Sequence, residues 1–87
     1  MSWCEALASL IDQGVSADDP MTQQVVKQVY DAKLAPLYTQ LGKDGILAWL
    51  EAESNHPKQK ALLNAIHPSF AEYYKEAMTH YIHSISC

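Results

Sequence analysis

The residues best suited to chemistry are gathered near the C-terminal end of the chain. His80, His83 and Cys87 are spaced i, i+3 and i+7, so a continuous helix would place three possible metal ligands on one face. A metal site also needs a fourth ligand or an open position, and chain ends usually fray. Histidines near the C-terminal end of a helix also interact favourably with its dipole. We therefore expect solvated histidines in this segment and no metal site.

The candidates for catalysis elsewhere in the chain lack partners. His56 and His67 each precede a proline, and a local role at the start of a helix is the simpler interpretation. Two pairs of glutamates lie close in sequence: Glu51 with Glu53, and Glu72 with Glu76. Both pairs are typical of solvated helix faces rather than of paired catalytic acids. Because neither a Gly-rich phosphate loop nor a nucleophile elbow occurs, the sequence predicts a protein that is not an enzyme and binds no cofactor.

Composition limits the kinds of partner. The 87 residues are 48% hydrophobic and 18% charged, which is typical of one globular domain over residues 1–87. The net charge is −4, and six lysines are too few to neutralise a run of phosphates or to bind an anionic membrane surface. No apolar run approaches the roughly 20 residues that span a bilayer. We expect a cytoplasmic protein that contacts neither nucleic acid nor membrane, with Cys4 and Cys87 as free thiols and a disulfide between them as the alternative.

Helix start and stop signals predict five helices. They cover residues 3–13, 20–41, 45–53, 57–66 and 68–84. Ser2 and Glu5 form a capping-box pattern, and Asp19 followed by Pro20 is a second start signal. Pro36 should bend the long helix because it removes one backbone hydrogen bond. Since no segment alternates apolar and polar residues as a strand does, the sequence predicts an all-α fold, a single helical bundle.

The segment 68–84 is the predicted central element. Its apolar residues recur at helical spacing and cover a face wider than one neighbouring helix can bury. They are Phe70, Tyr73, Tyr74, Ala77, Met78, Tyr81 and Ile82. Two interpretations are open: a core helix whose tyrosine hydroxyls reach the surface, or a helix that lines a pocket with part of this face.

Aromatic rings are numerous for a chain of this size. They are Trp3, Tyr30, Tyr38, Trp49, Phe70, Tyr73, Tyr74 and Tyr81. Rings with polar tips suit a pocket for a flat, partly polar ligand, because stacking tolerates variation in the ligand and the tips fix its orientation. The alternative is that the same rings only fill the core of the bundle.

Two segments resemble one known family. Residues 5–20, EALASLIDQGVSADDP, are similar to the ALxxLMDEGVPPDDP stretch of the TipAS antibiotic-recognition domains. Residues 56–78, HPKQKALLNAIHPSFAEYYKEAM, resemble the DPRFxxxYxxIHxGLAEYxxxAI ending of the same family. The order and separation of the two segments match as well, so the resemblance covers nearly the whole chain.

The resemblance implies a globin-like helical fold without haem, with a cleft for thiopeptides or other amphipathic aromatic drugs. TipAS domains are the effector parts of some MerR-type transcription regulators, in which ligand binding orders flexible helices, while other members are free-standing and sequester the drug. This sequence lacks the winged helix, the coiled coil and the longer N-terminal lead-in of the regulators, so we expect no operator contact from it. Pro36 is followed by Leu37-Tyr38-Thr39-Gln40 in place of the cysteine used for covalent capture, so covalent attachment there is not expected.

The sequence and the resemblance together predict a non-enzymatic domain that binds a hydrophobic, aromatic small molecule. The predicted lining residues are Tyr38, Trp49, Phe70, Tyr73, Tyr74 and Met78. Rings would stack on the ligand, and Met78 would adapt to its outline. The alternative function is a helical protein–protein interaction module or a homodimerisation domain.

Overall fold

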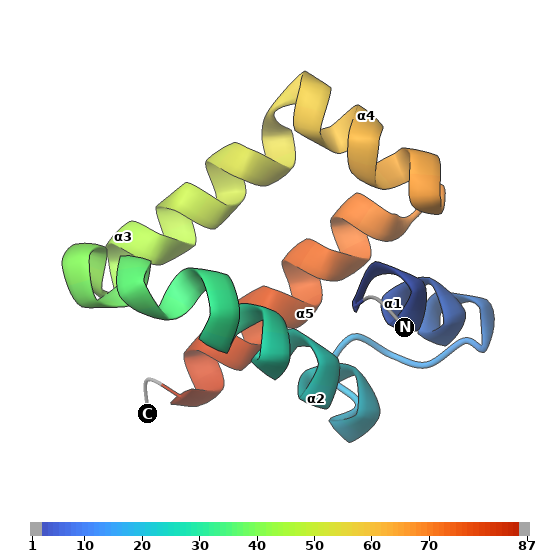
Figure 1. The fold of residues 1–87 in the computed structure, drawn as a ribbon, viewed down its shortest axis with the longest axis horizontal. Coiled ribbons are helices and arrows are strands. Elements are labelled where there is room, and N and C mark those ends of the chain that lie inside the picture. The colour runs from blue at the N-terminus through green and yellow to red at the C-terminus, as the bar shows by residue number, and fades with distance from the viewer. Residues whose placement is uncertain (1–2, 86–87) are drawn as a thin grey trace.

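Helices account for most of residues 3–85, the part of the chain that the computed structural model describes (Figure 1). The elements are α1 (Trp3–Asp12), α2 (Pro20–Val29), a π-helical turn η1 (Tyr30–Leu34), α3 (Ala35–Asn55), α4 (Pro57–Ile66) and α5 (Phe70–Ile85). No strand occurs within residues 3–85, so the predicted all-α fold is confirmed. The predicted cap at Ser2 and the possible ligand or disulfide partner Cys87 lie outside the described residues.

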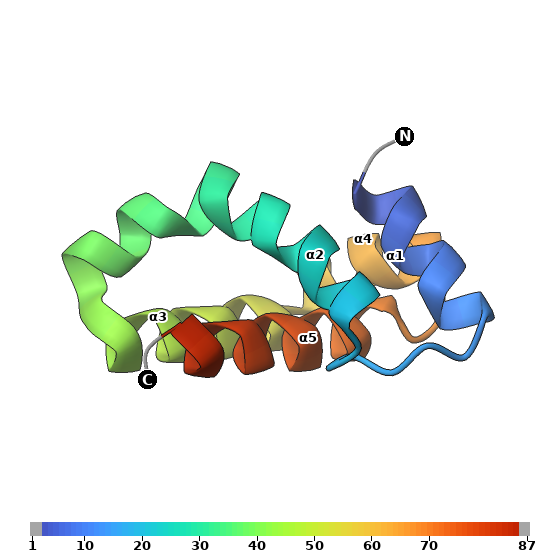
Figure 2. The same ribbon diagram turned by 90° about the horizontal axis from the view of Figure 1, so that it is seen from below.

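Helix α5 is the central element of the fold. It contacts α1, α2, α3 and α4, and the views in Figures 1 and 2 show it among them. Figure 2 shows the later, yellow-green part of α3 side by side with α5 in one layer, and the first part of α3 with α1 and α2 in the layer above. The wide apolar face of α5 is buried by these neighbours: Phe70, Ala77, Met78 and Ile82 have no exposed surface. The breadth of that face therefore reflects packing on several sides of one helix.

The helix predicted over residues 20–41 is interrupted earlier than the bend expected at Pro36. Helix α2 ends at Val29, and the π turn follows, in which the Ala35 N–H donates to the Tyr30 carbonyl five residues back. Pro36 then lies in the first turn of α3, where its missing N–H costs nothing. The wider turn accommodates the proline ring, which would otherwise meet a carbonyl of the preceding turn. The helical chain therefore bends between α2 and α3 at the π turn, residues 30–34.

Two other boundaries differ from the sequence prediction. The backbone of α3 leaves helical geometry at Gly42, with φ 75° and ψ 179°, and α3 continues to Asn55. This conformation is accessible almost only to glycine, so Gly42 forms a kink where the sequence predicts the end of one helix at residue 41 and the start of another at residue 45. Helix α5 begins at Phe70, two residues later than predicted, because residues 68–69 form a turn. Asn64 caps this start by accepting the Ala71 N–H at 3.2 Å.

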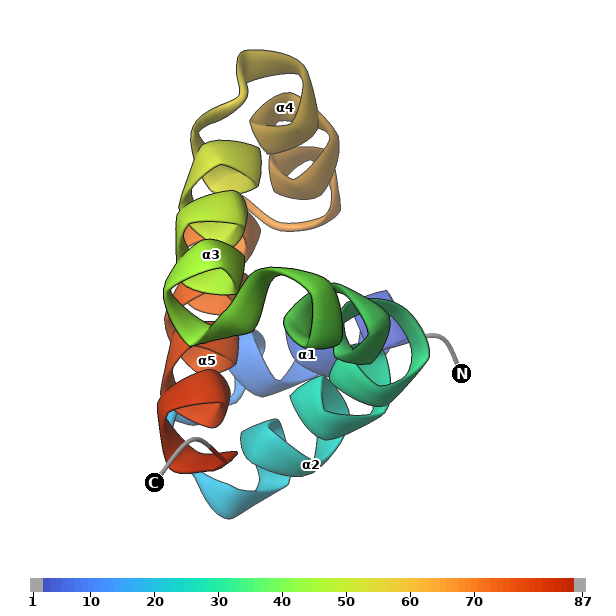
Figure 3. The ribbon, with the colours of Figure 1, turned by 90° about the vertical axis from the view of Figure 1, so that its left-hand side faces the viewer.

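Helix α4 is the least buried helix of the described chain. It lies beyond the end of α3, at the opposite end of the molecule from α2 (Figure 3). None of its residues is buried, and Leu62 and Ile66 are 61% and 44% exposed. Within residues 3–85 no helix combines the length and the apolar character needed to cross a membrane.

Candidate functional site

A hollow of about 150 Å³ opens between α1, η1, α3, α4 and α5. Its lining comes from every one of these elements: Trp3, Lys33, Leu34, Trp49, Leu50, Glu53, Ser54, Gln59, Leu63 and Tyr74. A cavity of this volume with apolar walls accepts one benzene-sized molecule in other proteins. The hollow can therefore hold a ring, and the rest of a larger ligand would lie outside it.

Aromatic side chains hold one another in place along one wall. The ring of Trp3 lies 5.3 Å from Tyr74 and 5.9 Å from Phe70, measured between centroids. Phe70 and Tyr74, one turn apart on α5, are stacked with centroids 6.5 Å apart and planes 10° apart. Phe70 is fully buried and supports the other two rings from behind. Such contacts stabilise ring orientation beyond simple burial, so this wall is preformed.

The floor of the hollow is apolar. Leu34 and Leu50 are 1% and 2% exposed and belong to the hydrophobic core. Ser54, the polar residue beside them, donates its hydroxyl to the Leu50 carbonyl at 2.9 Å. Because that hydroxyl hydrogen bonds within its own helix, the floor favours an apolar group over water.

The charged residues of the lining lie at its exposed edge. The Lys33 ammonium is 5.5 Å from the centroid of the Trp3 ring, in a cation–π arrangement. Glu53 follows Trp49 by one turn of α3 and is exposed. Within residues 3–85, neither Lys33 nor Glu53 forms an ion pair. The hollow therefore carries one ammonium and one carboxylate that are available to a ligand.

The Tyr74 phenol and the Cys4 thiol, both near the hollow, are protonated at neutral pH because the pKa of each is raised. Burial, helped by the nearby Cys4 thiol and Glu53, raises the pKa of Tyr74 to about 12. Burial likewise raises the pKa of the Cys4 thiol, although Lys33 opposes the change. At neutral pH the phenol is a hydrogen-bond donor and the thiol is not a nucleophile, because nucleophilic attack needs the thiolate.

The structure brings only Trp49 and Tyr74 of the six predicted lining residues to this hollow. Phe70 and Met78 are 0% exposed and belong to the core, so no ligand reaches Met78. The ring of Tyr38 lies edge-on to Tyr30, with centroids 6.4 Å apart, and is not part of the lining. Helical periodicity grouped these residues with Trp49 and Tyr74, because it identifies an apolar face without showing which neighbour covers it.

Tyr73 is likewise engaged away from the hollow. Its hydroxyl donates to the Val15 carbonyl at 2.9 Å and lies 2.8 Å from the hydroxyl of the buried Thr22. These contacts attach α5 to Val15, in the segment between α1 and α2, and to Thr22 in α2. Tyr73 is therefore a structural residue, and its hydroxyl is not free to orient a ligand.

Several lining residues were not predicted from the sequence. The sequence identifies Trp3 only as one of the aromatic residues, and it places Lys33 in a regular helix over residues 20–41. The hollow depends on the π turn, which places Lys33 over Trp3, and local patterns did not predict that turn.

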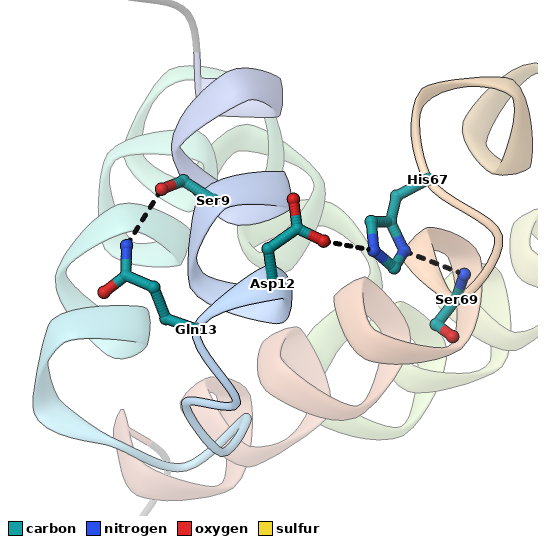
Figure 4. A network of polar contacts seen from close by, with 5 residues as sticks. All are labelled: Ser9, Asp12, Gln13, His67 and Ser69. Atoms are coloured by element: carbon teal, nitrogen blue, oxygen red, sulfur yellow. Dashed lines mark hydrogen bonds and ion pairs between the residues drawn. The ribbon is translucent and has the colours of Figure 1, made fainter.

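His67 has a local structural role at the junction of α1 with α5 (Figure 4). Its Nε2 lies 2.9 Å from Asp12 Oδ1, and its Nδ1 accepts the Ser69 N–H at 3.2 Å. Because Nδ1 accepts, Nε2 carries the proton that it donates to Asp12. Nearby, the Gln13 side chain donates to the Ser9 hydroxyl at 2.9 Å within the end of α1 (Figure 4).

The surface near His80 and His83 offers no enclosed site. A wide depression of about 480 Å³ follows one face of α5 and is lined by Glu72, Lys75, Glu76, Thr79, His80 and His83. All of these residues belong to one helix, so no second element closes the depression. Among residues 3–85, no three His, Cys, Asp or Glu side chains are placed to hold a metal ion.

Comparison of the chain with protein-family models, with curated proteins and with solved structures gave no match. The resemblance of residues 5–20 and 56–78 to TipAS domains stays a prediction.

Proposed function

We propose that this protein is a non-enzymatic domain that binds an aromatic small molecule in the hollow between α1, α3, α4 and α5. The observation that carries the proposal is the hollow itself, about 150 Å³ with an apolar floor and aromatic rings from three helices. A few polar groups around an apolar space are typical of small-molecule sites. Trp3, Trp49 and Tyr74 would stack against the inserted ring.

The resemblance to TipAS domains supports the same proposal. The two similar segments include most of α1 without Trp3, all of α4 and the first half of α5, and these three helices line the hollow. A ligand in contact with helices far apart in sequence would bias their relative positions, which is what an effector domain requires. We propose a drug-sensing part of a MerR-type regulator or a free-standing drug-sequestering domain.

The size of the hollow restricts how a large antibiotic would bind. A thiopeptide carries several rings, and about 150 Å³ holds only one of them. The remaining rings would lie on the surface around the opening. Ligands with one accessible flat ring are therefore the first to test.

A thermal-shift screen of thiopeptides and smaller aromatic antibiotics tests the proposal. A ligand at 100 times its dissociation constant stabilises the folded state by about 2.7 kcal/mol, which corresponds to roughly 10 °C or more in a domain of this size. Trp49→Leu should reduce the shift, whereas Tyr38→Leu, which removes a ring outside the hollow, should leave it. Absence of a shift with every compound would contradict the proposal.

Exposed apolar residues on α4 favour a second candidate, a protein-interaction module. Leu62 and Ile66 are one turn apart and largely exposed, a spacing that a partner helix or a second copy could cover. This function predicts a melting temperature that rises with protein concentration and does not respond to ligands. It also predicts that Leu62→Lys abolishes the concentration dependence.

A further inference from the structure

The hollow carries two opposite charges that do not neutralise each other. Lys33 comes from η1 and Glu53 from α3, and both belong to the lining. Neither forms an ion pair within residues 3–85.

The two charges are associated with different walls. Lys33 extends over the face of Trp3, with its ammonium 5.5 Å from the ring centroid. Glu53 lies one turn after Trp49 on the same face of α3, and its charge acts on the Tyr74 phenol. A ring inserted between these walls would have the ammonium near one part of its edge and the carboxylate near another.

We infer that the ligand of this hollow inserts a single flat ring that carries both an acidic and a basic substituent. The acidic group would pair with Lys33 and the basic group with Glu53. This inference rests on the binding function proposed above and names the chemical class of its ligand. The volume of the hollow limits the inserted part of the ligand to about one ring. The charges of Lys33 and Glu53 favour one acidic and one basic substituent on that ring.

Ligands with fewer charges satisfy the site less well. A neutral ring fills the apolar space and leaves both side chains hydrated at the edge, without selectivity. A ring with one charge meets one opposite and one like charge. An amphoteric ring pairs both, and because Lys33 and Glu53 are exposed, each pair should contribute about twofold to fivefold in affinity.

Four probes that share one para-substituted benzene ring test the inference. They are 4-methylbenzyl alcohol, 4-methylbenzoate, 4-methylbenzylamine and 4-(aminomethyl)benzoate. Dissociation constants are measured by NMR titration of the isotope-labelled protein, with the amide and side-chain signals of Trp3, Trp49 and Tyr74 as reporters. We expect the amphoteric probe to bind about tenfold more tightly than the neutral one.

Charge-removing variants assign the selectivity to the two residues. Lys33→Met should remove the advantage that a carboxylate gives a probe, and Glu53→Gln should remove the advantage of an amine. Glu51→Gln on α3 and Lys58→Met on α4 change the same charges outside the lining and serve as matched controls. Unchanged spectra away from the hollow show that each variant remains folded.

The outcomes separate this inference from the proposed function. If all four probes perturb the three reporters with equal affinity, the hollow binds rings but the ligand class is wrong. If a singly charged probe binds most tightly, the class is also wrong. If no probe perturbs the reporters at millimolar concentration, both the ligand class and the binding function at this hollow are overturned.

Discussion

The hydroxyl of Tyr73 donates to the carbonyl of Val15 at 2.9 Å, across 58 positions of sequence. The same hydroxyl lies 2.8 Å from the hydroxyl of Thr22, which is fully buried and also bonds the Ser16 carbonyl at 3.0 Å. One phenol thus fixes the segment between α1 and α2 against α5. Since α1 supplies Trp3, this bond also holds one wall of the hollow in place.

Tyr73→Phe should destabilise the protein by about 1–3 kcal/mol, because it leaves the Val15 carbonyl without its hydrogen-bond donor. For a domain of this size the melting temperature should fall by roughly 4–8 °C per kcal/mol. Urea unfolding measures the loss. Tyr81→Phe, which removes a partly exposed phenol, is the control and should change the free energy of unfolding by less than about 0.5 kcal/mol. Equal effects of the two variants would contradict this role of Tyr73.

Substitutions of Met78 test whether this residue only packs in the core or also contacts a ligand. Met78 is 0% exposed, so its truncation should cost about 2–5 kcal/mol through lost burial and the cavity left behind. The volume-conserving Met78→Leu should cost less than about 1.5 kcal/mol. Below its melting temperature, Met78→Leu should bind an aromatic probe with unchanged affinity, as measured by NMR titration. A loss of affinity in Met78→Leu would show that Met78 contributes to ligand binding.

Local chemistry explains which parts of the fold could be predicted from the sequence. Asp19 caps α2 by accepting the Met21 N–H at 2.9 Å, and Pro20 follows at the start of that helix. Such signals depend on residues within one turn, and the sequence contains all of them. The break between the helices predicted to end at residue 41 and to begin at residue 45 was predictable for the same reason, because the φ of 75° at Gly42 is one that glycine adopts readily.

The hollow could not be predicted because it depends on contacts between distant residues. Trp3 meets Tyr74 across 71 positions, the difference between their residue numbers. Periodicity placed Phe70, Tyr73 and Tyr74 on one broad face of α5, but only the packing of α1 and α2 decides which of them remains accessible. The π turn is a similar case, since a proline predicts a bend without predicting the residues that absorb it.

The raised pKa of Tyr74 predicts a loss of stability in alkali. Burial, with the Cys4 thiol and Glu53, raises this pKa from 10.0 to about 12, so folding favours the protonated phenol. Its contribution is complete below pH 10 and is lost as the pH rises through about 12. At about 1.4 kcal/mol per pKa unit, the loss across this window is roughly 2–3 kcal/mol.

Absorbance at the phenolate band and urea unfolding from pH 9 to pH 12 measure this dependence. Tyr74→Phe should remove the last-titrating phenolate and flatten the decline in unfolding free energy. Part of the decline should remain in that variant, because burial also raises the pKa of Tyr30. Titration of all phenols near pH 10 would show that Tyr74 is more hydrated than its surroundings indicate.

Amide hydrogen exchange should be fastest, among the helices, in α4. No residue of α4 is buried, whereas α5 contributes Phe70, Ala77, Met78 and Ile82 to the core. Local opening of α4 therefore exposes little apolar surface and costs less free energy than opening of α5. Gln59 and Leu63 belong both to α4 and to the lining of the hollow, so a bound aromatic probe should slow exchange in α4 more than in α2. Exchange measured by NMR with and without the probe checks both statements, and protection of α4 equal to that of α5 in the free protein would contradict the first.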